Sequence, residues 1–167
     1  MTEHISILDQ ARSFAIEHHG DQKYGNNLPY RWHLEKVAAL AERLGYPQAI
    51  QVAAWLHDTV EDTGVTIDEI RQLFGDKVAE IVAAVTYSEN DKQQGVDKIQ
   101  KARENLGSHV VKFCDASVNF SASALDGAPG HMSQWKATVT RYGSFIVQLQ
   151  PDLPTPAEVE KWLAAPR

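Results

Sequence analysis

Residues 47–64 of the chain read PQAIQVAAWLHDTVEDTG, an apolar run that passes directly into a charged one. Pro47 suits the first turn of a helix, because the amide proton that proline lacks would have no partner there. Positions 50–56 are apolar apart from Gln51. We therefore expect a buried, central helix that ends near Gly64.

Helical periodicity continues on both sides of this stretch, with apolar residues at three- and four-residue steps. The expected helices span residues 5–20, 30–45, 47–64, 66–75, 77–85, 96–106, 109–122 and 132–149, and a short one follows Thr155. Residues 20–29 are polar and Gly-rich and predict a loop, and residues 87–95 predict an exposed loop or a frayed helix start. Because no strand-like alternation persists, we predict an all-α fold, with one domain over residues 1–167.

The composition is typical of a globular protein, with 43% hydrophobic and 23% charged residues in a chain of 167. No apolar run approaches the roughly 18 residues of a membrane span. The first residues, MTEHISILDQARSF, have neither the basic nor the apolar region of a signal peptide. The lone cysteine, Cys114, excludes an internal disulfide and a Cys-rich metal site. We therefore expect a cytoplasmic protein with no membrane partner.

The charge balance indicates which partners to expect. The net charge is −6, from 16 Lys and Arg against 22 Asp and Glu, and the basic residues are scattered. Nucleic-acid-binding proteins normally carry a basic excess or stripe, because phosphate contacts supply most of their affinity. We expect no nucleic-acid partner, whereas a small anion fits if local cations or a metal override the global charge. The sequence leaves a monomer and a homo-oligomer equally open.

Four ionisable side chains fall within the six residues 57–62, namely His57, Asp58, Glu61 and Asp62. A buried carboxylate without a partner is costly, so these groups should face a metal, a cation or solvent. In a helix, Glu61 lies one turn beyond His57, and Asp62 lies one turn beyond Asp58. This helix end therefore offers either two neighbouring rows of ligand-type side chains or simply a solvated surface.

Two further residues favour a metal site. His33 lies early in a helix whose other face is apolar, and Asp115 follows a mainly apolar run. Together with His57 and Asp58 they form a mixed nitrogen and oxygen set, which suits Mn²⁺, Fe²⁺ or Zn²⁺ better than Ca²⁺. Such a set can leave positions open for water and substrate, as a hydrolytic metal requires. The alternative is that each histidine is a satisfied structural residue.

The order of these residues resembles that of the HD metal-dependent phosphohydrolases. The segments that carry the resemblance are PYRWH (29–33), AAWLHDTVEDT (53–63), FGDKVAEIVAAVT (74–86) and VKFCDASVN (111–119). They are most similar to the hydrolase domain of the RelA/SpoT alarmone enzymes and to stand-alone small alarmone hydrolases, including the metazoan SpoT homologue. The likeness covers roughly residues 5–125.

This resemblance implies an all-helical fold that holds one Mn²⁺ through His33, His57, Asp58 and Asp115. The implied reaction removes the 3′-diphosphate from the nucleotide ppGpp and gives GDP and pyrophosphate. The family assigns the positions of Glu61 and Asp62 to the catalytic water. No synthetase-like segment follows, so the resemblance implies degradation alone.

Some substrate-contacting positions depart from the family pattern. The Arg-Lys pair that usually precedes Pro-Tyr-x-x-His is replaced by a loop that starts Gln22-Lys23, and Lys23 is the remaining candidate cation. The usual Asp-Arg-x-x-Asn is altered by Ala116, whereas Asn119 is kept as a candidate substrate contact. Lys112 is placed either to reach a phosphate or to form an exposed ion pair. Related substrates such as pppGpp, the adenine analogues or other nucleotides therefore stay open.

Two functional classes compete. The first is a metal-dependent nucleotide hydrolase, and the second is a non-catalytic nucleotide- or metal-binding sensor module. A sensor needs the metal ligands at most, whereas hydrolysis also needs groups that handle water. Because both Glu61 and Asp62 are present, we favour the enzyme. His18 and His19 end the first expected helix, where we assign them to the helix dipole.

Overall fold

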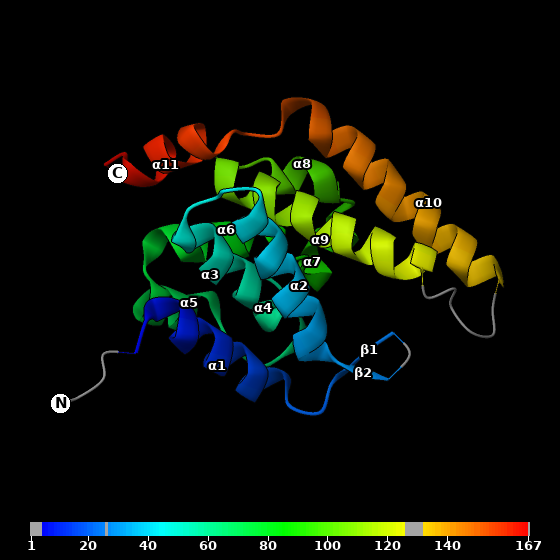
Figure 1. The fold of residues 1–167 in the computed structure, drawn as a ribbon, viewed down its shortest axis with the longest axis horizontal. Helices are drawn as coiled ribbons and strands as arrows, with labels where there is room; N and C mark the ends of the chain where they lie inside the picture. Colours follow the sequence, from blue (N-terminus) through cyan, green and yellow to red (C-terminus); the bar gives the residue numbers. More distant parts are fainter. Residues whose placement is uncertain (1–4, 26, 126–131, 167) are drawn as a thin grey trace.

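The structure, a computed structural model, describes residues 5–25, 27–125 and 132–166. Its α-helices are α1 (Ile7–His19), α2 (Tyr30–Arg43), α3 (Gln48–Leu56), α4 (Thr59–Asp62), α5 (Ile67–Phe74), α6 (Asp76–Val85), α7 (Glu89–Gln94), α8 (Lys98–Ala102), α9 (Leu106–Leu125), α10 (Met132–Leu149) and α11 (Pro156–Ala164). A 3₁₀ turn, η1 (Gln150–Asp152), joins α10 to α11. The predicted all-α fold is confirmed (Figure 1).

Helix α3 forms the centre of the core, as its apolar sequence predicts. Its side chains from Val52 to Leu56 are all buried, and Ile50 is fully buried. The helix packs against α1, α2, α6 and α9, and from Val52 onwards it is covered on all sides. This burial holds the residues that follow Leu56 at a fixed place inside the bundle.

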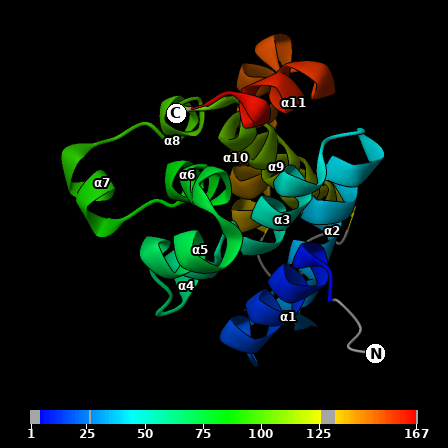
Figure 2. The same ribbon diagram turned by 90° about the vertical axis from the view of Figure 1, so that its left-hand side faces the viewer.

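Helix α9 lies between this bundle and α10, which runs alongside it (Figure 1). After η1 the chain continues beyond the end of α10 into α11, whose capping box is built by Thr155 and Glu158. The hydroxyl of Tyr46 donates to the carbonyl of Pro154 at 2.6 Å, which fastens the start of α11 to the loop before α3. Helix α7 lies at the edge of the molecule, away from α1 and α2 (Figure 2).

The expected helix over residues 47–64 is wrong in one respect, because it is interrupted at His57 and Asp58. Helix α3 ends at Leu56 and the short α4 begins at Thr59. Asp58 has φ −99° and ψ −6°, which places it in the sparsely populated bridge region of backbone conformations. Many active-site residues lie in this region. Its carbonyl still accepts the amide of Asp62 at 2.9 Å. The two ligand-type residues therefore occupy a turn, and α4 carries Glu61 and Asp62.

The predicted loop over residues 20–29 contains a small antiparallel hairpin, β1 (Lys23–Tyr24) and β2 (Leu28–Pro29). Gly25 (φ 50°) and Asn27 (φ 70°) take the left-handed conformations that such a tight connection requires. Because neighbouring residues of a strand point to opposite sides, Lys23 and Tyr24 face different ways.

The segment before α9 also differs from the expectation. Residues 89–94 form α7, which begins with a capping box of Ser88 and Asp91 and ends at Gly95 in the left-handed conformation. Helix α8 is shorter than the expected helix over residues 96–106, and α9 begins at Leu106. In the observed arrangement, Lys98 and Lys101 of α8 lie beside the cavity described below.

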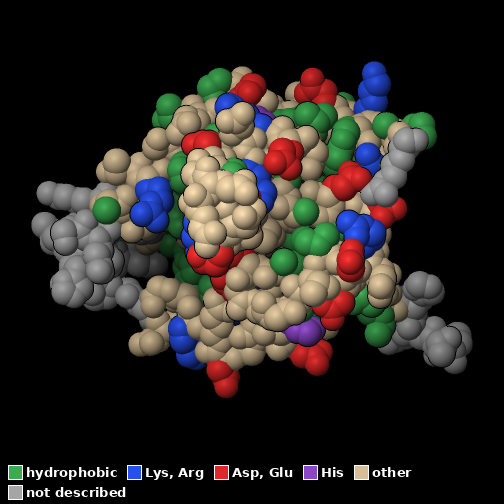
Figure 3. Space-filling model, turned by 180° about the vertical axis from the view of Figure 1, so that it is seen from behind, with side chains coloured by type: hydrophobic (Ala, Val, Ile, Leu, Met, Phe, Trp, Pro, Cys, Tyr) green, Lys and Arg blue, Asp and Glu red, His purple; other side chains and the backbone are tan. Residues whose placement is uncertain are grey.

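Charged side chains of both signs are interspersed over the face shown in Figure 3. Among the helices that the structure describes, none combines the length and apolar character needed to cross a bilayer.

Candidate metal centre and active site

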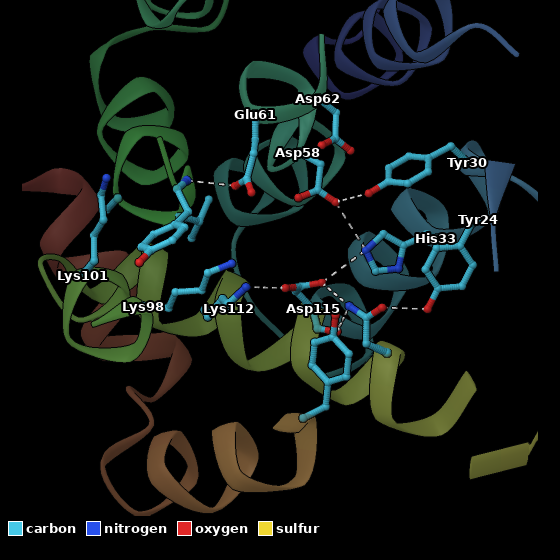
Figure 4. Close-up of a pocket in the computed structure, with 15 residues that line it drawn as sticks. Tyr24, Tyr30, His33, Asp58, Glu61, Asp62, Lys98, Lys101, Lys112 and Asp115 are labelled. Atoms are coloured by element: carbon cyan, nitrogen blue, oxygen red, sulfur yellow. Dashed lines mark hydrogen bonds and ion pairs between the residues drawn. The ribbon is translucent and has the colours of Figure 1, made fainter. Parts of the chain in front are cut away.

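Four ligand-type side chains converge from three parts of the fold; His33, Asp58 and Asp115 are shown in Figure 4. His33 comes from the first turn of α2, His57 and Asp58 from the turn after α3, and Asp115 from the middle of α9. The Nε2 atoms of His33 and His57 are 3.3 Å apart. Oδ2 of Asp58 lies 3.0 Å from Nε2 of His57, and Oδ1 of Asp115 lies 3.2 Å from Nε2 of His33. Ligand atoms of His33, His57 and Asp58 all lie within 4.8 Å of one another.

The cluster is largely withdrawn from solvent. His33, His57 and Asp115 are 1%, 2% and 5% exposed, and the side chain of Asp58 is 22% exposed. Burial by itself raises the pKa of the carboxyls of Asp58 and Asp115 and lowers that of the His57 imidazole. The opposite charges outweigh burial, because His57 lies beside Asp58 and Lys112 beside Asp115. The pKa of both carboxyls is held below its usual range, and that of His57 above it.

The hydrogen bonds around the cluster fit a bound metal ion. Nδ1 of His57 lies 2.7 Å from the carbonyl of Ala54, which can only accept, so Nδ1 carries a proton whether or not the ring is charged. Once Nε2 gives up its proton, its lone pair would be available to a metal ion on the side of the cluster. Nδ1 of His33 is buried without a hydrogen-bond partner among the described residues. No neighbouring donor therefore prevents Nδ1 from carrying the ring proton, which would leave Nε2 to face the cluster. Two imidazole nitrogens and two carboxylates are the donor types that divalent transition metals accept.

Neighbouring groups fix the two carboxylates. The hydroxyl of Tyr30 donates to Oδ2 of Asp58 at 2.6 Å. Lys112 donates to Oδ2 of Asp115 at 2.7 Å, and the amide nitrogen of Asn119 donates to Oδ1 at 2.6 Å. Tyr24 then donates its hydroxyl to the amide oxygen of Asn119 at 2.8 Å. Each carboxylate is therefore oriented by at least one donor outside the pair of histidines.

Glu61 and Asp62, both on α4, are held by two different segments of the chain. The backbone amide of Tyr87 donates to Oε2 of Glu61 at 2.8 Å, and the side-chain amide of Gln22 donates to Oδ2 of Asp62 at 2.8 Å. Loss of hydration raises the pKa of Glu61, and the negative charge of Asp58 adds to this, against the opposing bond from Tyr87. A carboxyl with a raised pKa is closer to the range in which it exchanges protons near neutral pH.

These groups border one cavity of about 260 Å³. Its lining combines three of the four cluster residues with carboxylates, cations and aromatic rings: Tyr24, Tyr30, His33, Asp58, Glu61, Asp62, Ala84, Val85, Tyr87, Lys98, Lys101, Lys112, Asp115, Asn119 and Tyr142. The three lysines lie on the side of the cavity away from Tyr24 and Tyr30 (Figure 4). An anionic ligand in the cavity would meet the positive charge of the lysines next to the ligand cluster, which Lys112 contacts through Asp115.

The structure brings together most of the residues singled out from the sequence. Of these, the residues that line this cavity are His33, Asp58, Asp115, Glu61, Asp62, Lys112 and Asn119. His57 lies behind them, with its Nε2 3.3 Å from that of His33. Lys23 does not, because its side chain is exposed while Tyr24 lines the cavity in its place. Ala116 is fully buried and is not part of the lining.

Sequence reasoning missed Lys98, Lys101 and Tyr142. Lys98 lies 4.3 Å from the centre of the Tyr87 ring, and Lys101 is paired with Asp91 at 2.6 Å. The N-cap residue Asp97 marks the start of α8 and was an available signal for that helix. No pattern in the sequence predicts that α8 and α10 lie near α4, because tertiary packing brings these helices together.

The chain belongs to the HD domain family, whose model matches residues 11–113. The resemblance seen in the sequence is thus confirmed for the family. The chain is 42% identical over 84 residues to the guanosine-3′,5′-bis(diphosphate) 3′-pyrophosphohydrolase of Aquifex aeolicus, which covers 50% of this chain and 12% of that protein. It is 38% identical over 81 residues to the GTP pyrophosphokinase rsh of Brucella ovis, which covers 48% of this chain and 11% of that protein. The chain thus spans about a tenth of the length of these relatives.

Two solved structures are similar to this fold. One is a metazoan orthologue of SpoT that hydrolyses ppGpp, with a TM-score of 0.75, 19% identity and coverage of 96% of both chains. The other is a protein of Listeria monocytogenes, with a TM-score of 0.61, 27% identity and coverage of 76% of this chain and 88% of that one. The first likeness, at this identity, concerns the fold alone.

Proposed function

We propose that this chain hydrolyses ppGpp at the 3′-diphosphate and releases GDP and pyrophosphate. The observation that carries the proposal is the buried His33–His57–Asp58–Asp115 cluster, three members of which line the same cavity as two oriented carboxylates and three lysines. The name of the Aquifex relative and the membership of the HD family support this substrate and reaction.

The residues proposed to hold the metal are His33, His57, Asp58 and Asp115, and we propose Mn²⁺ as the ion. When bound, such an ion would lower the pKa of water and offset negative charge on the phosphate. The choice of Mn²⁺ over Ca²⁺ rests on the two imidazole nitrogens, because Ca²⁺ prefers oxygen ligands alone.

Glu61 is proposed to accept the proton of the attacking water. Its Oε2 is occupied by the amide of Tyr87, which leaves Oε1 to face the cavity. Asp62 is similarly bonded through Oδ2, so its Oδ1 is available to orient the same water. Attack on phosphorus breaks the bond to the 3′ oxygen, pyrophosphate leaves with the oxygen of water, and the 3′ oxygen gains a proton.

Lys98 and Lys112 are proposed to bind phosphate oxygens. Burial lowers the pKa of Lys98, and nearby Lys112 lowers it further, so an anion between them would relieve repulsion. Asn119 is a weaker candidate for a direct contact, because both atoms of its amide are already bonded to Tyr24 and Asp115. Lys23 would need to move to reach a ligand in the cavity.

A second substrate class, another phosphorylated nucleotide, is favoured by one observation. No cation of the described part of hairpin β1–β2 lines the cavity, so the end near Tyr24 offers aromatic and amide groups to the ligand. A less highly charged nucleotide would suit that end.

Product analysis tests the proposal. Metal-stripped protein is reloaded with Mn²⁺, incubated with ppGpp and resolved by anion-exchange chromatography beside Asp58→Ala. Equal amounts of GDP and pyrophosphate from the wild type alone are expected. If the metal is bound and ppGpp stays intact, the proposal is wrong, and a panel of other nucleotides under the same conditions separates the second class from a sensor module.

A further inference from the structure

A buried histidine outside the cavity is connected to the candidate catalytic carboxylates. His19, the last residue of α1, is 5% exposed and does not line the cavity. Its Nδ1 lies 2.7 Å from the amide oxygen of Gln22, whose amide nitrogen donates to Asp62 at 2.8 Å. Its place in the core differs from the helix-dipole role expected from the sequence.

The backbone holds Gln22 in place independently of its side chain. The backbone N–H of Gln22 donates to the backbone carbonyl of His19 at 2.9 Å, and the backbone carbonyl of Gln22 accepts the backbone N–H of Tyr30 at 3.0 Å. The side chain thus starts from a point fixed to both α1 and α2. Its amide group then bridges His19 and Asp62 without help from solvent.

The direction of each hydrogen bond follows from the chemistry of the partners. An ionised carboxylate only accepts, so the amide of Gln22 must turn its nitrogen to Asp62 and its oxygen to His19. That oxygen needs a donor, so Nδ1 of His19 carries the proton. Burial lowers the pKa of His19, against the opposing bond to Gln22, which favours the neutral ring. Nε2 then accepts, and the hydroxyl of Thr59 lies 3.5 Å from it.

His19 is therefore linked to both ends of the four-residue helix α4, directly at one end and through Gln22 at the other. Thr59 is its first residue, and Asp62, reached through Gln22, is its last. The ring of His19 also stacks on Tyr30, with ring centres 4.6 Å apart and planes at 15°. Tyr30 is the residue that donates to Asp58.

We propose that His19 and Gln22 are positioning residues that fix the carboxylate of Asp62, so that its free oxygen faces the attacking water. This inference rests on the proposed function of Asp62. Neither residue touches the reacting atoms. Without them, α4 keeps its backbone bonds, but Asp62 is free to turn towards solvent.

The first test does not depend on the substrate. Nitrogen-15 NMR of the histidine rings in the metal-free protein identifies which ring nitrogen of His19 carries the proton. We expect the Nδ1–H tautomer in the wild type and a mixture of tautomers in Gln22→Ala. A wild-type Nε2–H tautomer would overturn the proposal, because the amide of Gln22 would then present its oxygen to Asp62.

The second test separates positioning from stability. For Gln22→Ala we expect kcat to fall about tenfold to a hundredfold, as for a misplaced catalytic group, and KM to change less than about twofold. Gln22→Glu should lose at least as much, since its carboxylate repels Asp62. Gln72→Ala, in which an exposed glutamine of α5 is removed, is the matched control and should keep wild-type kcat.

Rescue by a related side chain tests His19 itself. The amide nitrogen of asparagine can replace Nδ1 as a donor, so His19→Asn should retain more kcat than His19→Leu, with similar unfolding temperatures. His18→Leu, at the exposed neighbouring histidine, is the control. Equal kcat in both His19 variants, or unchanged kcat in Gln22→Ala, would contradict the proposal. If the wild type does not turn over ppGpp, the proposed function has failed, and the tautomer still decides whether the His19–Gln22 bridge is as described.

Discussion

At the residue scale, Asp58 is one of two carboxylates, with Asp115, that lie close to both histidines. Its Oδ2 lies 3.0 Å from His57 and 3.6 Å from His33, and it accepts the hydroxyl of Tyr30. Asp58→Ala should therefore lose both bound Mn²⁺ and ppGpp turnover, because removing one ligand leaves the other groups without their common partner. Metal content by mass spectrometry after desalting is the measurement. Asp68→Ala, at an exposed site on α5, should keep the metal, and full metal retention in Asp58→Ala would contradict the assignment.

Glu61 is expected to affect chemistry without affecting the metal. Glu61→Gln keeps an oxygen for the amide of Tyr87 but cannot take up a proton. We expect kcat to fall by about 10²-fold or more, with unchanged metal content. The wild-type rate should rise with pH as Glu61 loses its proton, above the usual range of a glutamate, because loss of hydration raises its pKa. Glu42→Gln on the exposed side of α2 is the control, and normal turnover in Glu61→Gln would exclude the role.

At the scale of elements, the packing of α9 against α6 depends on Gly107. A Cβ at this position would lie 2.5 Å from Cδ1 and 2.6 Å from Cγ1 of Ile81, and 3.1 Å from Cδ1 of Ile50. Gly107→Ala should lower the free energy of unfolding by about 1–3 kcal/mol, because crowding in a packed core outweighs the better helix propensity of alanine. Gly64→Ala has open space around its Cβ and serves as the control. Urea unfolding of the two variants compares them directly.

Helix α7 is joined to α8 by an ion pair that should make their docking sensitive to acid. Lys101 donates to Asp91 at 2.6 Å, and this bond, with those from Ser88, lowers the pKa of Asp91 from 3.8 to about 2. Because the folded-state pKa is the lower one, the stabilisation is complete above pH 3.8 and is lost as the pH falls towards about 2.

Asp91→Asn should therefore be less stable than the wild type near neutral pH, and the difference should shrink through that acidic window. Urea unfolding of both proteins over a pH series measures it. A constant difference at all pH values would show that the charge of Asp91 does not contribute.

At the scale of the whole molecule, the sequence predicts what is local and repeated. The apolar stripe of α3 and the ligand-type residues after it are visible because helical spacing and burial follow directly from residue type. His33 and Asp115 are likewise recognisable as polar residues within apolar runs. The spacing of residues along the sequence cannot show that His33 and Asp115 meet in the tertiary structure. The family resemblance predicts that they do.

Other features lie beyond sequence reasoning for definite reasons. A strand of two residues is too short to show alternation, so the sequence predicts a loop where the structure has hairpin β1–β2. The sequence contains no helix-breaking residue that would predict the interruption of the helix at His57 and Asp58. Lys98 and Tyr142 reach the cavity only because α8 and α10 dock beside α9.

Glu61 and Asp62 are hydrogen-bonded to two separate segments of the chain, so catalytic activity should be sensitive to local unfolding of either segment. One carboxylate depends on the segment at Tyr87 and the other on the segment at Gln22, and neither segment belongs to the central helix α3. Segments of this kind open at lower free energy than the core around them. Turnover should therefore disappear at urea concentrations that leave the helical circular dichroism signal intact, and coincident loss of both would show that site and core open as one cooperative unit.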